Sequence, residues 1–166
     1  MTQRLFILRH AKSSWAEPGQ DDFDRPLNPR GVRAAAAMAA HAAKRGLVFD
    51  HVICSPAART RQTWAAFAKA LPNAPPPDFE ETAYLAPRQT WAGLIRSSPA
   101  DARSVLVVGH NPGLHELALW LAPKADVGKF PTGAFAEFEL RIAAWRDLDA
   151  GRGALLAFET PKSLSD

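Results

Sequence analysis

Short apolar runs alternate along this chain with longer segments of helical composition. The strand-like segments are residues 4–8, 49–54, 80–84, 104–109, 134–140 and 154–159. Helices are predicted between them, at residues 29–46, 57–71, 87–97 and 114–121. This alternation predicts an α/β fold, a three-layer α/β/α sandwich around a mainly parallel sheet, with the last two strands antiparallel at an edge.

Nothing in the pattern divides the chain. The proline-rich segment 72–77 is short enough to be a loop, and no internal repeat is visible. A chain of 166 residues fits one domain, so residues 1–166 are predicted to form a single domain.

Composition excludes several classes of protein. No apolar run approaches the roughly 20 residues that cross a bilayer, and no signal peptide precedes the first strand, so we expect a cytoplasmic protein without a membrane partner. The only cysteine, Cys54, excludes an internal disulfide and a cysteine-based metal site. The net charge of +3 is dispersed along the chain, which argues against a nucleic-acid partner. We expect a monomer.

The polar residues that could take part in a reaction follow three of the predicted strands. Arg9 and His10 follow the first, Arg59 lies shortly after the second, and His110 and Asn111 follow the central strand. In a parallel sheet the carboxyl ends of the strands meet at one edge, where ligands of α/β folds bind. The two arginines and two histidines are therefore expected to converge.

Such a cluster suits a phosphoryl group. Guanidinium groups bind phosphate oxygens in a bidentate manner, and a neutral imidazole can attack phosphorus to form a phosphohistidine. His110 and His115 are five residues apart, which is not the spacing of a helical zinc pair, and no HExxH pattern occurs. We therefore expect no metal and no cofactor.

Three sequence blocks resemble one known family. Leu8-Arg9-His10-Ala11, Ser55-Pro56-x-x-Arg59-x-x-Gln62-Thr63 and Val108-Gly109-His110-Asn111-Pro112 resemble the signature blocks of the histidine phosphatase superfamily, with Ala11 in place of the usual glycine. The opening of residues 9–13 and the block 108–113 are most similar to SixA-type phosphohistidine phosphatases.

The resemblance implies a phosphoglycerate mutase-like fold and assigns roles. It implies that His10 is the nucleophile and that Arg9, Arg59 and His110 complete the phosphate pocket. Ser13 and Asn111 are candidates for substrate binding. The implied partner is a protein phosphorylated on histidine, or else a small phosphorylated substrate.

The resemblance does not extend to a general acid. Many relatives supply a glutamate near the end of the third strand, where this chain has Leu85, and Glu80 and Glu81 lie earlier. A phosphohistidine can expel neutral imidazole, so the missing acid favours that substrate. Two alternatives stay open: a small-molecule phosphomonoesterase or mutase of the same superfamily, and a non-catalytic phosphate-recognition module, which Ala11 and the unlocated acid would suit.

Two loop residues have two interpretations each. Trp15 follows the first block and either lines the mouth of the pocket or anchors its loop. Asp24 belongs to an acidic run that is either solvated or, through Asp24, orients Arg25 or Arg30.

Overall fold

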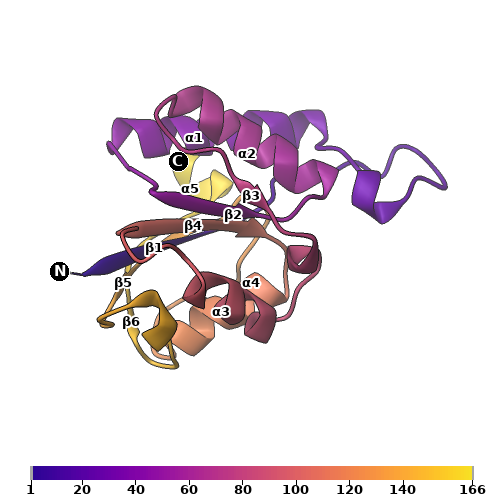
Figure 1. Ribbon diagram of the computed structural model, residues 1–166. Helices are drawn as coiled ribbons and strands as arrows, with labels where there is room; N and C mark the ends of the chain where they lie inside the picture. Colours follow the sequence, from indigo (N-terminus) through magenta and orange to yellow (C-terminus); the bar gives the residue numbers. More distant parts are fainter. Residues whose placement is uncertain (1, 166) are drawn as a thin grey trace.

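The computed structural model describes residues 2–165 and is built around one twisted sheet (Figure 1). The strands are β1 (Gln3–Arg9), β2 (His51–Cys54), β3 (Asp78–Phe79), β4 (Ser104–Gly109), β5 (Phe135–Leu140) and β6 (Gly153–Glu159). Their order is β3-β2-β4-β1-β5-β6. The first four are mutually parallel, and β5 and β6 are antiparallel, as the sequence predicted.

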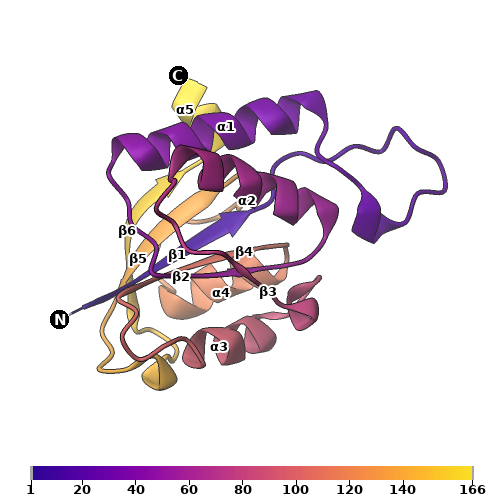
Figure 2. The same cartoon turned by 45° about the horizontal axis from the view of Figure 1, so that its top comes forward.

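Helices cover both faces of the sheet. They are α1 (Pro29–Lys44), α2 (Ala58–Ala70), α3 (Arg88–Arg96), α4 (Gly113–Leu121) and α5 (Pro161–Ser165). Figures 1 and 2 show α1, α2 and α5 on one face and α3 and α4 on the other, which confirms the three-layer sandwich. Across residues 2–165, no helix is both long enough and apolar enough to span a bilayer.

Strand β1, which lies between β4 and β5, contributes to the hydrophobic core on each face of the sheet, because successive side chains of a strand point to opposite faces. Leu5 and Ile7 are buried in the core under α3 and α4. Phe6 and Leu8 are buried in the core under α1 and α2. Full burial of such a side chain stabilises the fold by about 1.5–3 kcal/mol, so the sheet position of β1 is fixed from both sides.

The strand predicted at residues 80–84 is wrong. Strand β3 lies earlier and is only two residues long, and residues Glu81–Ala83 form a 3₁₀ helix. The physical reason is the length of β2: the backbone N–H of Glu80 donates to the carbonyl of Cys54, the last residue of that strand. Beyond Glu80 the neighbouring strand offers no further partners, so the chain turns.

The five-residue helix α5 was not predicted, because a segment this short shows too little of a helical period. It packs beside α1 in both views (Figures 1 and 2).

Candidate active site

The carboxyl ends of β1, β2 and β4 lie level with one another, as predicted. Arg9 pairs with Gly109, and Cys54 pairs with Val108. Hydrogen bonds continue one residue past the strands, since the N–H of His10 donates to the carbonyl of Gly109 over 3.1 Å. This register brings the rings of His10 and His110, one hundred residues apart in the chain, to a centroid distance of 5.3 Å.

A pocket of about 330 Å³ opens at this edge. It is lined by Arg9, His10, Lys12, Ser13, Trp15, Arg25, Arg59, Leu85, His110, Asn111 and Thr132. The lining therefore contains all the residues that the sequence proposed for phosphate and substrate binding: Arg9, His10, Ser13, Arg59, His110 and Asn111. Lys12, Arg25, Leu85 and Thr132 had not been proposed.

The ring of His10 has a defined tautomer. Its Nδ1 lies 2.7 Å from the carbonyl oxygen of Ala11, which can only accept, so Nδ1 carries the proton. The lone pair of the neutral ring is then on Nε2. Burial is the main reason that the pKa of His10 is lowered to about 4; the Ala11 hydrogen bond opposes this shift, and the positive charges of Arg59 and Arg9 add to it. The ring is neutral at pH 7.

The methyl group of Ala11 does not enter the pocket. Ala11 is fully buried in a small cluster with Leu27 and Ala35, and its N–H donates to the hydroxyl of Thr63. The change from the family's usual glycine is thus absorbed by packing behind the site.

His110 is held by a residue of the second block. Its Nε2 lies 2.7 Å from the hydroxyl of the fully buried Ser55. Within the described residues its Nδ1 is buried and has no hydrogen-bond partner. Burial lowers the pKa of His110 to about 3, with a further contribution from His10. Like His10, this ring is neutral at pH 7.

One backbone carbonyl positions two pocket residues. The oxygen of Phe130 accepts from Nη1 of Arg9 over 3.1 Å and from the side-chain amide of Asn111 over 2.8 Å. Burial lowers the pKa of Arg9, as does the neighbouring charge of Arg59. The segment before β5, which no motif marked, therefore fixes one arginine of the site.

Arg59 is anchored by Asp22. Its Nη2 lies 3.1 Å from the Asp22 carboxylate and its Nη1 lies 2.8 Å from the Asp22 carbonyl oxygen. Arg59 is only 3% exposed, and Asp22 itself does not line the pocket. The carboxylate and the carbonyl of Asp22 therefore hold both terminal nitrogens of the guanidinium group.

The same carboxylate also binds Arg25 and Tyr84. The Nε of Arg25 lies 3.1 Å from Asp22 Oδ1, and the hydroxyl of Tyr84 donates to Asp22 Oδ2. Burial tends to raise the pKa of Asp22, but the hydrogen bonds from Tyr84, Arg25 and Arg59 outweigh it and lower the pKa to about 2. The Asp22 carboxyl group is therefore ionised at pH 7.

The solvated interpretation of Asp24 agrees with its exposed side chain, and it is a neighbouring aspartate, Asp22, that forms the ion pair with Arg25. The ion pairs of this segment use Asp22, whereas Asp24 forms no ion pair within the described residues. The segment Asp22–Asp24 is a 3₁₀ helix, so residues three apart lie on one side of it, and Asp22 faces Arg25. The i, i+3 spacing of these two residues was the available signal.

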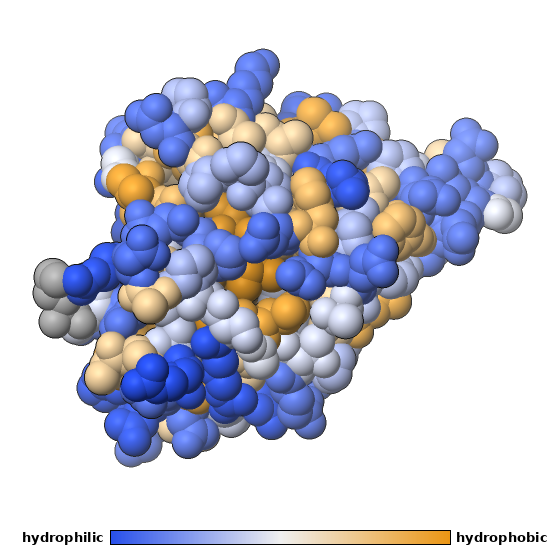
Figure 3. Space-filling model, viewed as in Figure 1, coloured by the Kyte–Doolittle hydropathy of each residue, from blue (hydrophilic) through white to orange (hydrophobic). Residues whose placement is uncertain are grey.

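Arg25 is a third arginine of the pocket. It is buried, its Nη1 lies 2.6 Å from the hydroxyl of Ser13, and its Cζ lies 3.5 Å from the centre of the Trp15 ring. Trp15 is 77% exposed and lines the pocket. The segment between β1 and α1, to which it belongs, projects from the body and is largely hydrophilic (Figures 1 and 3). Both interpretations of Trp15 hold: it lines the pocket and it stacks on Arg25.

Within residues 2–165, no carboxylate lines this pocket. Glu80 and Glu81, the candidate acids, are not in its lining, because the chain turns after β3. Leu85, in contrast, does line the pocket. Its backbone is in the left-handed region, at φ 51°, and its side chain is half exposed.

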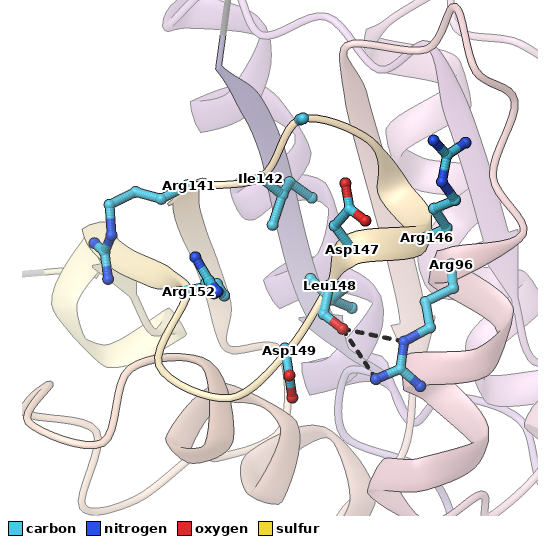
Figure 4. A pocket seen from close by; sticks show the side chains of 9 residues that line it. Arg96, Arg141, Ile142, Arg146, Asp147, Leu148, Asp149 and Arg152 are labelled. Carbon is cyan, nitrogen blue, oxygen red and sulfur yellow. Dashed lines mark hydrogen bonds between the residues drawn. The ribbon is translucent and has the colours of Figure 1, made fainter.

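A second hollow of about 530 Å³ carries four arginines, as Figure 4 shows. Its lining includes Arg141, the residue after β5. The last residue of β5, Leu140, pairs with Gln3 at the start of β1, so this hollow lies at the end of the sheet opposite the histidines. Asp147 and Asp149 share this hollow, and Arg96 donates from Nε and Nη2 to the carbonyl of Leu148. Within the described residues, its lining contains no histidine, serine or cysteine.

A metal site is not formed by the described residues. No group of three or more His, Cys, Asp or Glu side chains among residues 2–165 is arranged to hold an ion. His115 instead lies with Nε2 2.6 Å from the carbonyl of Val127, in a structural role.

Comparison with known proteins places this site in a family. Residues 5–86 match the model of the histidine phosphatase superfamily (branch 1). An uncharacterized protein of Mycobacterium tuberculosis strain H37Rv is 34% identical, over 93% of this chain and all of its own length.

Two solved structures agree in fold along nearly the whole chain. The putative phosphohistidine phosphatase SixA of Agrobacterium tumefaciens is 32% identical, with a TM-score of 0.84 over 97% of this chain and 99% of its own. A putative SixA from Nakamurella has the same identity and TM-score, over 97% of each chain. The expected phosphoglycerate mutase-like fold is confirmed. The chain is a phosphatase that belongs to the histidine phosphatase superfamily and resembles its SixA-type members.

Proposed function

We propose that this protein removes the phosphoryl group from phosphohistidine in a partner protein. The observation that carries the proposal is the pocket itself: arginines and neutral histidines surround one position, and within the described residues no carboxylate does. A phosphoryl group there would be bound by guanidinium groups that also stabilise the charge of its oxygens during transfer.

The first step uses His10. Its Nε2 lone pair attacks phosphorus while the P–N bond of the substrate breaks, and the leaving imidazole keeps the electron pair. If the other nitrogen of that imidazole carries a proton, the leaving group departs as a neutral molecule. In the second step water attacks phospho-His10, which regenerates the neutral ring and yields inorganic phosphate.

The unpartnered donors of the site support this assignment. Within the described residues, Nε of Arg9 and Nε of Arg59 are buried without an acceptor. A buried polar group left unpaired costs about 1–3 kcal/mol. Phosphoryl oxygens are acceptors of the right charge, and their binding would offset that cost.

The leaving group decides between the possible substrates. An alcohol phosphate must expel an alkoxide, which needs a proton, and a positioned general acid contributes about 10²–10⁴-fold to such a step. Leu85 lines the pocket at a position where an acidic side chain could have supplied this proton. The similarity to SixA proteins, which are named as phosphohistidine phosphatases, points to the same substrate.

The packing of Ala11 argues against the non-catalytic alternative. Its methyl group is buried with Leu27 and Ala35 and leaves the approach to His10 unchanged.

The test compares turnover of a histidine-phosphorylated protein with turnover of glycerol phosphate and phosphoglycerate. We expect kcat/KM to be higher for the phosphohistidine protein by about 10²–10⁴-fold, the contribution of the missing acid. Comparable values for the alcohol phosphates would favour the phosphomonoesterase alternative. Tight retention of the phosphoprotein without release of phosphate would favour the recognition module.

A further inference from the structure

A smaller hollow of about 170 Å³ adjoins the catalytic pocket. It is lined by Lys12, Arg30, Ala34, Pro131, Thr132, Thr160, Pro161 and Lys162. Lys12 and Thr132 also line the catalytic pocket, so the two hollows share a wall. The two hollows are therefore neighbours, separated by Lys12 and Thr132.

The charged residues that line this hollow, among those that the structure describes, are all positive. Lys12, Arg30 and Lys162 line it together with two threonine hydroxyls, and its lining within the described residues contains no carboxylate. The arginine hollow at the opposite end of the sheet differs, since two aspartates lie among its arginines (Figure 4).

Close packing holds Lys12 and Arg30 together. A Cβ on Gly31 would lie 2.0 Å from the carbonyl oxygen of Lys12, so only glycine lets α1 approach this segment so closely. The Lys12 carbonyl also accepts from the N–H of Asn28 over 3.0 Å. The backbone of Arg30, which lies between Asn28 and Gly31 in sequence, is thereby held close to Lys12.

Lys162 belongs to α5, the last helix of the chain. Gly133, at φ 78°, donates its N–H to the carbonyl of His10 over 2.9 Å, and a Cβ there would lie 2.8 Å from the ring of Pro161. The turn that touches the backbone of His10 thus also contacts the start of α5. Lys162 follows directly and completes the hollow.

We propose that this hollow, with Lys12, Arg30 and Lys162, is a subsite for a second anionic group of the substrate. The proposal rests on the proposed function, in which the first anionic group is the phosphoryl group beside His10. The second is either a carboxylate near the phosphohistidine of the partner protein or a further phosphate. The subsite would select substrates by charge without taking part in the chemistry.

The first experiment measures anion binding and does not depend on turnover. Isothermal titration calorimetry compares methylphosphonate with a series of α,ω-alkane bisphosphonates of increasing spacer length. We expect one spacer to bind about tenfold more tightly than methylphosphonate, as two added exposed ion pairs allow. The gain should disappear in the Arg30→Gln/Lys162→Gln variant and shrink in high salt.

A matched control removes the same charge elsewhere. Arg141→Gln/Arg152→Gln acts on the arginine hollow at the opposite end of the sheet and should keep the bisphosphonate gain. If no spacer binds more tightly than methylphosphonate beyond the statistical factor of two, the proposal is wrong. It is equally wrong if the Arg30→Gln/Lys162→Gln variant retains the gain or the control variant loses it.

The second experiment distinguishes the two sources of the anion. Phosphohistidine peptides that differ only by Glu or Gln next to the phosphorylated residue are compared with phosphoimidazole, which has no second anion. We expect a preference of about tenfold in kcat/KM for the Glu peptide, lost in Arg30→Gln/Lys162→Gln, with unchanged turnover of phosphoimidazole.

Its other outcomes are also decisive. Equal use of both peptides, together with a bisphosphonate gain, would overturn the peptide carboxylate and assign the subsite to a second phosphate. A wild-type protein that hydrolyses neither peptide nor phosphoimidazole would refute the proposed function, while the calorimetry still decides the subsite.

Discussion

The carboxylate of Asp22 lies 3.1 Å from Nη2 of Arg59, and the Asp22 carbonyl oxygen accepts from Nη1 of the same arginine over 2.8 Å. The two residues are 37 positions apart, and the contact closes the loop after β1 onto the first turn of α2. Arg59 is thus oriented before any phosphoryl group binds, which reduces the entropy lost when the group does bind.

Asp22→Asn should lower kcat by about 10–10²-fold, because a misplaced guanidinium group no longer matches the phosphoryl oxygens. The control is Asp24→Asn, which removes the same charge from the same 3₁₀ helix and should have nearly normal kinetics. Combined with Arg59→Lys, the Asp22→Asn change should add little, since both act on one group. Equal losses from both aspartate variants would mean that only the loop's charge matters.

Arg59→Lys should reduce kcat by about 10²–10³-fold although the charge is kept, because an ammonium group cannot reproduce a bidentate fork. Arg61→Lys is the matched control: it lies two residues on, on the same helix, and outside the pocket lining. Steady-state kinetics on one phosphohistidine substrate measure both. Near-normal activity of Arg59→Lys would place Arg59 outside the reaction.

His10 should carry the phosphoryl group during turnover. Rapid quenching without acid is expected to trap a label that is stable to alkali and labile to acid, as a P–N bond requires. His10→Ala should abolish labelling and turnover, whereas His110→Ala should retain some labelling, since it removes charge stabilisation and not the nucleophile. Label on His110 in the wild-type protein would overturn the assignment.

The pKa of His10 predicts a pH dependence. Burial lowers it from 6.5 to about 4, so the ring stays neutral and nucleophilic well below pH 6.5. In the unfolded chain the same ring takes up a proton near pH 6.5, so the free energy of unfolding should fall as the pH decreases from about 6.5 to 4. His110 adds to the same effect.

The measurement is an NMR titration of the histidine rings, with His10→Ala used to assign the resonance. The expected midpoint for His10 is about 4. A midpoint near 6.5 would show that the ring is solvated in solution, contrary to its burial in the structure.

Sequence alone determined the strands that carry the site and the residues at their ends. The runs before His10 and His110 are continuous and apolar, which predicts buried strands, and parallel strands place their carboxyl ends at one edge. The convergence of Arg9, His10, Arg59 and His110 follows from that local pattern together with one rule of topology.

Only the tertiary structure decided what supports those residues. The contacts of Asp22 with Arg59 and of Phe130 with Arg9 join segments that no local pattern relates, as does the hollow that Lys12 and Lys162 both line. Each depends on the path of a loop, and a loop's path is set by packing against distant elements. For the same reason the turn after Glu80, which follows from the short length of β2, was invisible in residues 80–84 themselves.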